Sequence, residues 1–311
     1  MVIHELIASP GTVHWGYYDA ALAPILTVAS GDRLQVHTES GFMDAMEKVR
    51  SRVSKELLAI IETCVKGAGG HMLIGPVAVE GARPGDVLEV RFIDARPRYD
   101  WGVNVFRPLR GCLPEDFPYH HSVVVEIDDA AGTADWGAGV KVPLDPFFGN
   151  FGVAPPPAMG QVASAPPGFW GGNLDNKELG PGATVYFPVF NEGAMFSIGD
   201  GHGCQGDGES CTSALETALS GTVELRLRKD MKLTHPRAET GTHHILMGFD
   251  PLIDNAAKMA LRETIDFLGE ARGMSRDDAY TLCSLAVDLH VTQIVNGVKG
   301  VHAMLPKAVL A

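Results

Sequence analysis

Three segments of the chain share one pattern, a tight turn followed by alternating apolar and polar residues. They are LTVASGDRLQVHT at 26–38, VAVEGARPGDVLEVRFID at 77–94 and ELGPGATVYFPVF at 178–190. A two-residue alternation of β-branched and aromatic residues is typical of strands, and Gly-Asp or Pro-Gly marks the bend before them. We therefore predict a mainly β fold, a β-sandwich or barrel built from recurring hairpin units.

Other parts of the chain extend this expectation. Strands are predicted at 121–128 (HSVVVEID) and 221–228 (GTVELRLR). The Gly- and Pro-rich stretch at 143–172 has no clear period, and we expect an irregular segment whose aromatic residues pack in an ordered way beside a site.

Helices are expected in three places. Apolar residues recur at helical spacing over 44–66 and over 254–272, and each run is followed by a glycine. Ser275 and Asp278 resemble a capping box that starts a third helix reaching roughly residue 290. These elements predict a β-rich domain at 1–230 that carries most of the site, and an α+β portion at 231–311 packed on it; the two are also compatible with one domain.

The charge balance limits the partners. With 25 Lys and Arg against 38 Asp and Glu, the formal net charge is −13, which disfavours nucleic acid and anionic membranes. The chain shows neither an apolar run of membrane-helix length nor the features of a secretion signal, so we expect a cytoplasmic protein. Five cysteines without C-x-x-C spacing favour unpaired thiols.

The stretch SIGDGHGCQGDGESC at 197–211 carries the strongest chemical signal. It offers Asp200, His202, Gln205, Asp207 and Glu209, separated mainly by glycine. Oxygen and imidazole donors of this kind suit zinc, manganese or calcium, whereas a solvated Gly-Asp loop remains the alternative. The EF-hand frame does not match, because Cys204 stands where an oxygen ligand belongs.

Two further motifs supply candidate groups from separate loops. His71 lies directly before the strand in GGHMLIGPV, and Asp175 lies in the polar loop GGNLDNKEL. Taken singly, each is as well explained by a core hydrogen bond or by turn chemistry.

The run GGNLDNKELGPGATVYFPVFNEGAMFSIGDGHGCQGDGE closely resembles the central signature of the acetamidase/formamidase family. The resemblance extends to TVHWGYYDAALAPILTVASGD, to GPVAVEGARPGDVLEV and to the C-terminal GMSRDDAYTLCSLAVDLHVTQIVNGVKGVHAMLPK, and so covers nearly the whole chain. The sequence departs from the family pattern at Ser210-Cys211-Thr212, after the QGDGE motif, which puts the identity of the substrate in question.

The resemblance implies a homo-oligomeric, metal-dependent enzyme that hydrolyses a short-chain carboxylic amide to ammonia and the acid. By matching positions it implies that the site contains His71, Asp175, Asp200, His202, Gln205, Asp207 and Glu209. Among these we predict His71, Asp200, His202 and Asp207 as metal ligands and Glu209, Asp175 and Gln205 as catalytic residues, with Asp175 as a further candidate ligand. Zinc is the first expectation for the ion, with calcium and manganese as alternatives. In this hypothesis Glu209 moves a proton from water to the departing ammonia.

Two other functions stay open at this point. One is a hydrolase or lyase of another small nitrogen compound with a carbamoyl, ureido or guanidino group. The other is a non-catalytic β-sandwich that binds a small molecule and holds structural calcium in the Gly-Asp loop.

Overall fold

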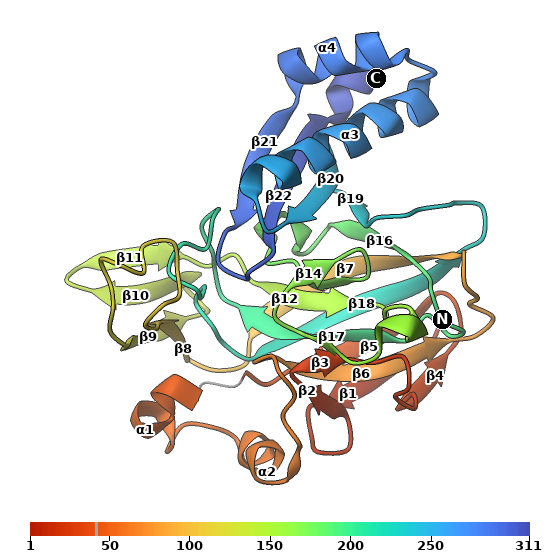
Figure 1. Ribbon diagram of the computed structural model, residues 1–311. Helices are drawn as coiled ribbons and strands as arrows, with labels where there is room; N and C mark the ends of the chain where they lie inside the picture. The colour runs from red at the N-terminus through yellow and green to blue at the C-terminus, as the bar shows by residue number, and fades with distance from the viewer. Residues whose placement is uncertain (41–42) are drawn as a thin grey trace.

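The protein is built on two β-sheets packed face to face, with a smaller sheet and two helical segments attached to them (Figure 1). The computed structural model describes residues 1–40 and 43–311. This architecture confirms the predicted mainly β fold with a C-terminal α+β portion.

The larger sheet has nine strands, and only its first pair is parallel. In spatial order the strands are β1 (Ile3–Ile7), β5 (Asp32–His37), β18 (Leu219–Arg228), β7 (Val87–Pro97), β16 (Thr184–Pro188), β19 (Arg237–Glu239), β20 (His243–Asp250), β22 (Lys299–Pro306) and β21 (Asp288–Gln293). The last four strands come from the C-terminal portion, so this sheet runs without a break across residue 230. The division into two domains there stays a prediction.

The second sheet has seven strands and holds the centre of the molecule. Its order is β14 (Pro167–Gly168), β15 (Gly171–Asn173), β12 (Phe147–Gly152), β17 (Phe196–His202), β6 (Met72–Val79) and β2 (Val13–Trp15), with β4 (Leu26–Val28) parallel to β6. A two-stranded ribbon joins β3 (Tyr17–Tyr18) to β13 (Val162–Ala163). Short 3₁₀ turns are η2 (Pro157–Met159), η3 (Lys177–Leu179) and η4 (Lys307–Leu310).

Aromatic side chains fill the space between the two sheets. Phe151 of β12 lies with its ring centroid 4.8 Å from that of Phe92 on β7 and 5.8 Å from that of Phe187 on β16. All three rings are buried. These contacts join the central strand of one sheet to the middle of the other, as in a sandwich.

The three turn segments do not form hairpins, and this part of the prediction is wrong. Each carries the chain from the seven-stranded to the nine-stranded sheet, from β4 to β5, from β6 to β7 and from β15 to β16. The glycines at the bends, Gly31, Gly85 and Gly182, all have positive φ. Their amides donate to Leu225, Val189 and Phe92 on or beside other strands. The bend is thus fastened to a distant strand, which directs the chain across the sandwich.

A four-stranded antiparallel sheet projects from one side of the sandwich (Figure 1). Its strands are β8 (Trp101–Phe106), β9 (His121–Asp128), β10 (Thr133–Gly137) and β11 (Val140–Pro143). β9 and β18 confirm the strands predicted at 121–128 and 221–228. The segment 143–172 is ordered as expected but less irregular, because β12 within it is a fully buried central strand.

The predicted helix at 44–66 is interrupted. It consists of η1 (Met43–Ala45), α1 (Met46–Val49) and α2 (Lys55–Thr63). Ser54 is extended and caps α2 by accepting the amide of Leu57, while its hydroxyl donates to Glu39. Arg52 in the break pairs with Asp100 and Glu126. These tertiary contacts favour the break over the continuous helix that the apolar period predicts.

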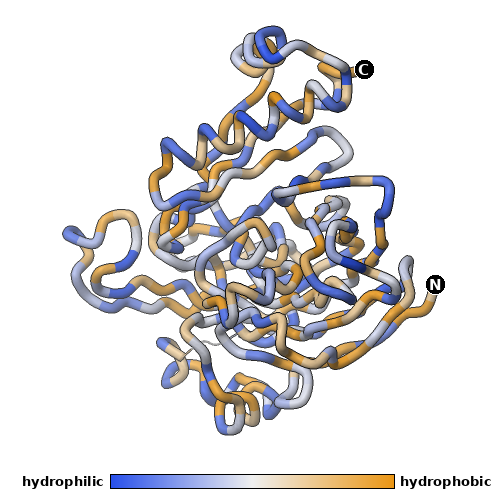
Figure 2. Tube along the Cα trace, turned by 45° about the vertical axis from the view of Figure 1, so that its right-hand side comes forward, coloured by the Kyte–Doolittle hydropathy of each residue, from blue (hydrophilic) through white to orange (hydrophobic). Residues whose placement is uncertain are grey.

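The C-terminal helices cover one face of β20 and β22 (Figure 1). α3 (Ile253–Arg272) confirms the second predicted helix and ends at Gly273, whose backbone is left-handed. Apolar and polar residues alternate along the helix (Figure 2). It approaches β20 so closely that a Cβ on Gly248 would lie 2.1 Å from the carbonyl oxygen of Ala256. α4 (Arg276–Ala286) begins at the predicted Ser275 cap but ends before residue 290, because the chain then pairs with β22 as strand β21.

Within the described residues 1–40 and 43–311, no helix combines the length and the apolarity needed to cross a bilayer.

Replacing Phe151 with Ala should remove the ring that joins the two sheets. We expect the free energy of unfolding to fall by about 3–5 kcal/mol, the usual cost of such a cavity. Equilibrium urea denaturation followed by circular dichroism measures this. The exposed Val65→Ala serves as control and should change stability by less than about 0.5 kcal/mol; equal stabilities of the two variants would contradict the sandwich core.

Candidate functional site

Four of the predicted site residues come together at the end of β17. Asp200 and His202 belong to this strand, Asp175 follows β15, and Glu209 lies in the loop after β17. The Nε2 atom of His202 lies 3.5 Å from Oδ2 of Asp200 and 4.0 Å from Oδ1 of Asp175. All four side chains are buried. β12 lies between β15 and β17 in the sheet, and this pairing brings Asp175 to the three residues of the 200–209 segment.

Asp175 is held by a chain of side-chain hydrogen bonds through the sheet. Tyr18 donates to Asn150, Asn150 donates to Asn173, and Asn173 donates to Oδ2 of Asp175. Asn296, from the turn between β21 and β22, donates to the same oxygen at 2.6 Å. Oδ1 of Asp175 is buried and has no hydrogen-bond partner. The carboxylate is thus fixed through one oxygen and leaves the other free.

Gln205 connects Asp175 to His202. Its amide nitrogen donates to the carbonyl oxygen of Asp175 at 2.6 Å, so its amide oxygen faces Nδ1 of His202 at 3.0 Å. With that oxygen as acceptor, Nδ1 carries a proton. Nε2 of His202 is the ring atom left to face Asp200 and Asp175, and Gln205 acts by orienting the ring.

His71 approaches the cluster from the start of β6. Its Nε2 lies 3.8 Å from Oδ2 of Asp200, and its Nδ1 is hydrogen-bonded to the hydroxyl of Ser164 at 2.8 Å. A histidine whose second nitrogen is held in this way has a fixed ring orientation, as is common around metal ions.

Glu216 completes the cluster and was missed by the sequence analysis. Its Oε1 lies 3.5 Å from Nε2 of His202, and it forms a ligand-like group with His202 and Glu209. Glu216 lies beyond the Gly-Asp loop in SALET, where no motif marks it. Its backbone bridges to Val103 and His202, which places it opposite the histidine. Only this non-local pairing identifies it.

Three of the clustered carboxylates lie on residues with left-handed backbone. Asp175, Asp200 and Glu209 have φ values of 46°, 60° and 45°. Such conformations cost of order 1–3 kcal/mol each in residues other than glycine, and they concentrate at functional sites. This backbone strain indicates that the fold loses some stability in order to direct these side chains into the cluster.

Burial and crowding shift the pKa values of the clustered groups. Burial raises the pKa of Asp175 to about 6, against the opposing charge of His202. Burial together with the negative charge of Asp175 raises the pKa of Glu209 well above its usual value. Burial acts in the same direction on Asp200, but His71 and His202 outweigh it and lower its pKa to about 2.

Negatively charged neighbours act on His202 at the centre of the cluster. Burial disfavours the charged form of His202, yet Glu216 and Asp200 outweigh it and raise the pKa of the imidazole well above its usual value. The same charges attract any other cation.

Gly149 on β12 keeps the centre of the cluster open. A Cβ at this position would lie 2.5 Å from Oδ1 of Asp175, 2.7 Å from Oδ2 of Asp200 and 2.6 Å from Cε1 of His202. Oε2 of Glu209, like Oδ1 of Asp175, is buried without a partner. Free carboxylate oxygens and imidazole nitrogens around a space without side chains fit a divalent cation. The residues that could hold it are Asp175, Asp200 and His202, which offer ligand atoms within 4.8 Å of one another, with His71 beside them.

The cluster lies in a cavity of about 460 Å³. Its wall includes Lys66, Arg107 and Arg110 as well as Asn296 from the C-terminal hairpin. A volume of this size admits a small organic molecule beside the carboxylates. The site is thus a pocket rather than a solvated loop.

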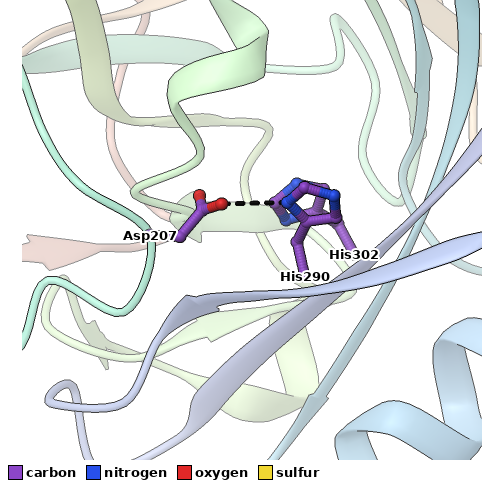
Figure 3. Close-up of side chains that lie close together, drawn as sticks. All are labelled: Asp207, His290 and His302. Carbon is purple, nitrogen blue, oxygen red and sulfur yellow. Dashed lines mark hydrogen bonds and ion pairs between the residues drawn. The ribbon is translucent and has the colours of Figure 1, made fainter.

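Asp207 lies outside this cluster, although its motif position made it a predicted ligand. Its Oδ2 contacts Nδ1 of His290 at 2.9 Å (Figure 3). The same oxygen lies 3.3 Å from Nζ of Lys177. It forms a separate group with His290 and His302. Asp207 and Glu209 are two residues apart in the loop after β17, yet they face different neighbours.

A further buried histidine and the cysteines lie in other surroundings. His14 is buried and hydrogen-bonded to Ser197 and to the carbonyl oxygen of Tyr17. All five cysteines are unpaired, as expected.

Comparisons with known proteins match most of the chain to one family. A model of the acetamidase/formamidase family matches residues 14–165 and 158–310. An acetamidase of Mycolicibacterium smegmatis is 29% identical over 197 residues, 45% of this chain and 48% of that protein. The chain thus spans about half the length of this curated relative.

Two solved structures are similar over nearly their full length. A predicted acetamidase/formamidase of Thermoanaerobacter tengcongensis is 28% identical, with a TM-score of 0.87 over 99% of this chain and 97% of that one. An acetamidase of Bacillus halodurans is 30% identical, with a TM-score of 0.86 over 99% and 98%.

Replacing Gly149 with Ala should crowd the centre of the cluster. We expect Zn²⁺ affinity, measured by calorimetry on chelator-treated protein, to fall by about 10- to 100-fold, as when groups around metal ligands are disturbed. Gly206→Ala is the matched control, because a Cβ there meets nothing within 4 Å. Equal affinities in two folded variants would show that the space beside Gly149 holds no cation.

Proposed function

Because the chain belongs to the acetamidase/formamidase family, we propose that it hydrolyses a short-chain carboxylic amide to ammonia and the carboxylic acid with the help of a divalent cation, zinc in the first place. The support comes from the family match, from the names of the relatives and from the geometry of the pocket. One observation carries the proposal: Asp175, Asp200, His202 and Glu209 are buried together, and two of their oxygens face the centre without a partner.

Amide hydrolysis makes three demands on a site. An amide is a weak electrophile with a poor leaving group, so water must be activated, the developing oxyanion stabilised and the departing nitrogen protonated. A divalent cation, when bound, supplies Lewis acidity and lowers the pKa of water. Asp175, Asp200 and His202 would hold it, and His71 is placed to take part.

The protein's own groups prepare the site for this reaction. Gln205 and the chain from Tyr18 through Asn173 fix the directions of His202 and Asp175 before substrate arrives. Such preorganisation reduces the reorganisation that the reaction requires. Burial of the cluster keeps bulk water away from these groups, which strengthens their electrostatic effect.

Glu209 is the group proposed to transfer the proton. Its Oε2 is buried and unpartnered, and its raised pKa brings proton uptake closer to neutral pH. A carboxyl group with a raised pKa can take a proton from water and give it to the leaving nitrogen. The role follows from the free oxygen and from its place in the pocket wall.

We extend the proposal to a homo-oligomer. Exposed apolar side chains on α4 and β21, including Tyr280, Leu285 and Leu289, support a contact between copies. A monomer mass in static light scattering would contradict it.

Glu209→Gln keeps the shape of the side chain but removes its ability to carry the proton. We expect turnover of formamide and acetamide, followed by ammonia release and acid formation together, to fall by about 100- to 10,000-fold. Glu192→Gln, outside the pocket wall, is the control and should retain activity. Unchanged turnover of Glu209→Gln would remove this residue from the chemistry.

Removal of divalent cations should abolish activity reversibly. Dialysis against a chelator is expected to reduce both metal content, measured by mass spectrometry, and ammonia release, and added Zn²⁺ should restore both. A metal-free preparation that remains fully active would refute the dependence on a cation while leaving amide hydrolysis itself intact.

A further inference from the structure

Asp207, His290 and His302 form a second cluster of ligand-type side chains. Asp207 lies in the loop after β17, His290 on β21 and His302 on β22 (Figure 3). One ligand atom from each lies within 4.8 Å of the other two. None of these residues belongs to the groups formed by Asp175, Asp200, His202, Glu209 and Glu216.

His302 is the residue that distinguishes this cluster from an ordinary surface ion pair. Its side chain is fully buried, Nδ1 is hydrogen-bonded to the hydroxyl of Thr292 at 2.7 Å, and Nε2 has no hydrogen-bond partner. A buried ring nitrogen without a partner is costly. A hydrogen bond at one nitrogen that leaves the other free is the arrangement found in metal-binding histidines.

The other two residues supply an entry route and charge. The side chains of Asp207 and His290 are 29% and 35% exposed, so the cluster is open to solvent on one side. His290 stacks on His302 with ring centroids 5.1 Å apart. Two imidazoles and a carboxylate with an open side suit zinc and similar transition metals.

We propose that Asp207, His290 and His302 bind a second divalent transition-metal ion. This ion links the C-terminal hairpin, formed by β21 and β22, to the loop that carries Glu209. The two segments are already joined by backbone hydrogen bonds, from Gly208 to Thr292 and from Ile294 to Gly208. An ion at this place adds a link between side chains two residues before Glu209. The inference does not depend on amide hydrolysis.

Lys177 competes with a metal ion for the carboxylate of Asp207. Its Nζ lies 3.3 Å from Oδ2 of Asp207 and occupies the same oxygen as His290. The second carboxylate oxygen and the mobility of a lysine side chain allow a metal to replace this pair. Removing the lysine charge should therefore strengthen metal binding.

The test is a titration of chelator-treated protein with Co²⁺, followed by visible absorption and by metal analysis. We expect wild type to bind one more Co²⁺ per chain than His290→Gln or Asp207→Asn, with the affinity at this site reduced by roughly 100-fold or more when a ligand is lost. Co²⁺ should also raise the melting temperature of wild type more than that of either variant. Lys177→Gln should bind Co²⁺ at this site roughly tenfold more tightly than wild type.

Two controls separate this site from the first. His235 forms a similarly exposed pair with Glu263, at 3.3 Å, and His235→Gln should bind as many Co²⁺ ions as wild type. In an Asp200→Asn background the first site is weakened, and the remaining Co²⁺ should still be lost on His290→Gln. If His290→Gln and Asp207→Asn bind the same number of Co²⁺ ions as wild type with the same affinity in that background, the second site does not exist.

Discussion

Burial of three carboxylates around one histidine is the constraint on which the rest of the structure depends. Asp175, Asp200 and Glu209 are packed against His202 with little access to water. Charges in such a place are costly unless an opposite charge or enough donors balance them. The shifted pKa values of these groups reflect this imbalance, and a bound cation would relieve it.

The sandwich provides the rigidity that such an arrangement requires. β12 lies between β15 and β17 in one sheet, and the three strands supply Gly149, Asn173 and Asp200. The aromatic core between the sheets packs against β12 through Phe151. The C-terminal portion adds Asn296 to the same carboxylate. Residues from the N-terminal and the C-terminal part of the chain therefore form the site together. The continuous nine-stranded sheet joins these two parts.

Much of this arrangement is encoded locally and could be predicted. Strand alternation identified β9 and β18, the apolar period and Gly273 identified α3, and the Gly-Asp loop identified Asp200, His202 and Glu209. The predictions failed where tertiary contacts decide. The turns at Gly31 and Gly85 look like hairpin turns, but their amides donate to Leu225 and Val189, which lie far away in sequence. The helix over 44–66 is broken by the contacts of Ser54 and Arg52.

The site shows the same division between local and non-local information. The spacing in QGDGE cannot reveal that Asp207 turns towards His290 while Glu209 faces His202, because both depend on where β21 and β22 lie. Glu216 has no motif and is placed by a backbone bridge to β17.

The central claim is that the space beside Gly149 holds a divalent cation bound by Asp175, Asp200 and His202. The most direct measurement is anomalous diffraction at the zinc absorption edge from crystals grown with Zn²⁺. The account predicts a peak with carboxylate oxygens and a histidine nitrogen of this cluster at about 2.0–2.2 Å. Zinc density confined to other parts of the molecule, with this space filled by water alone, would contradict it.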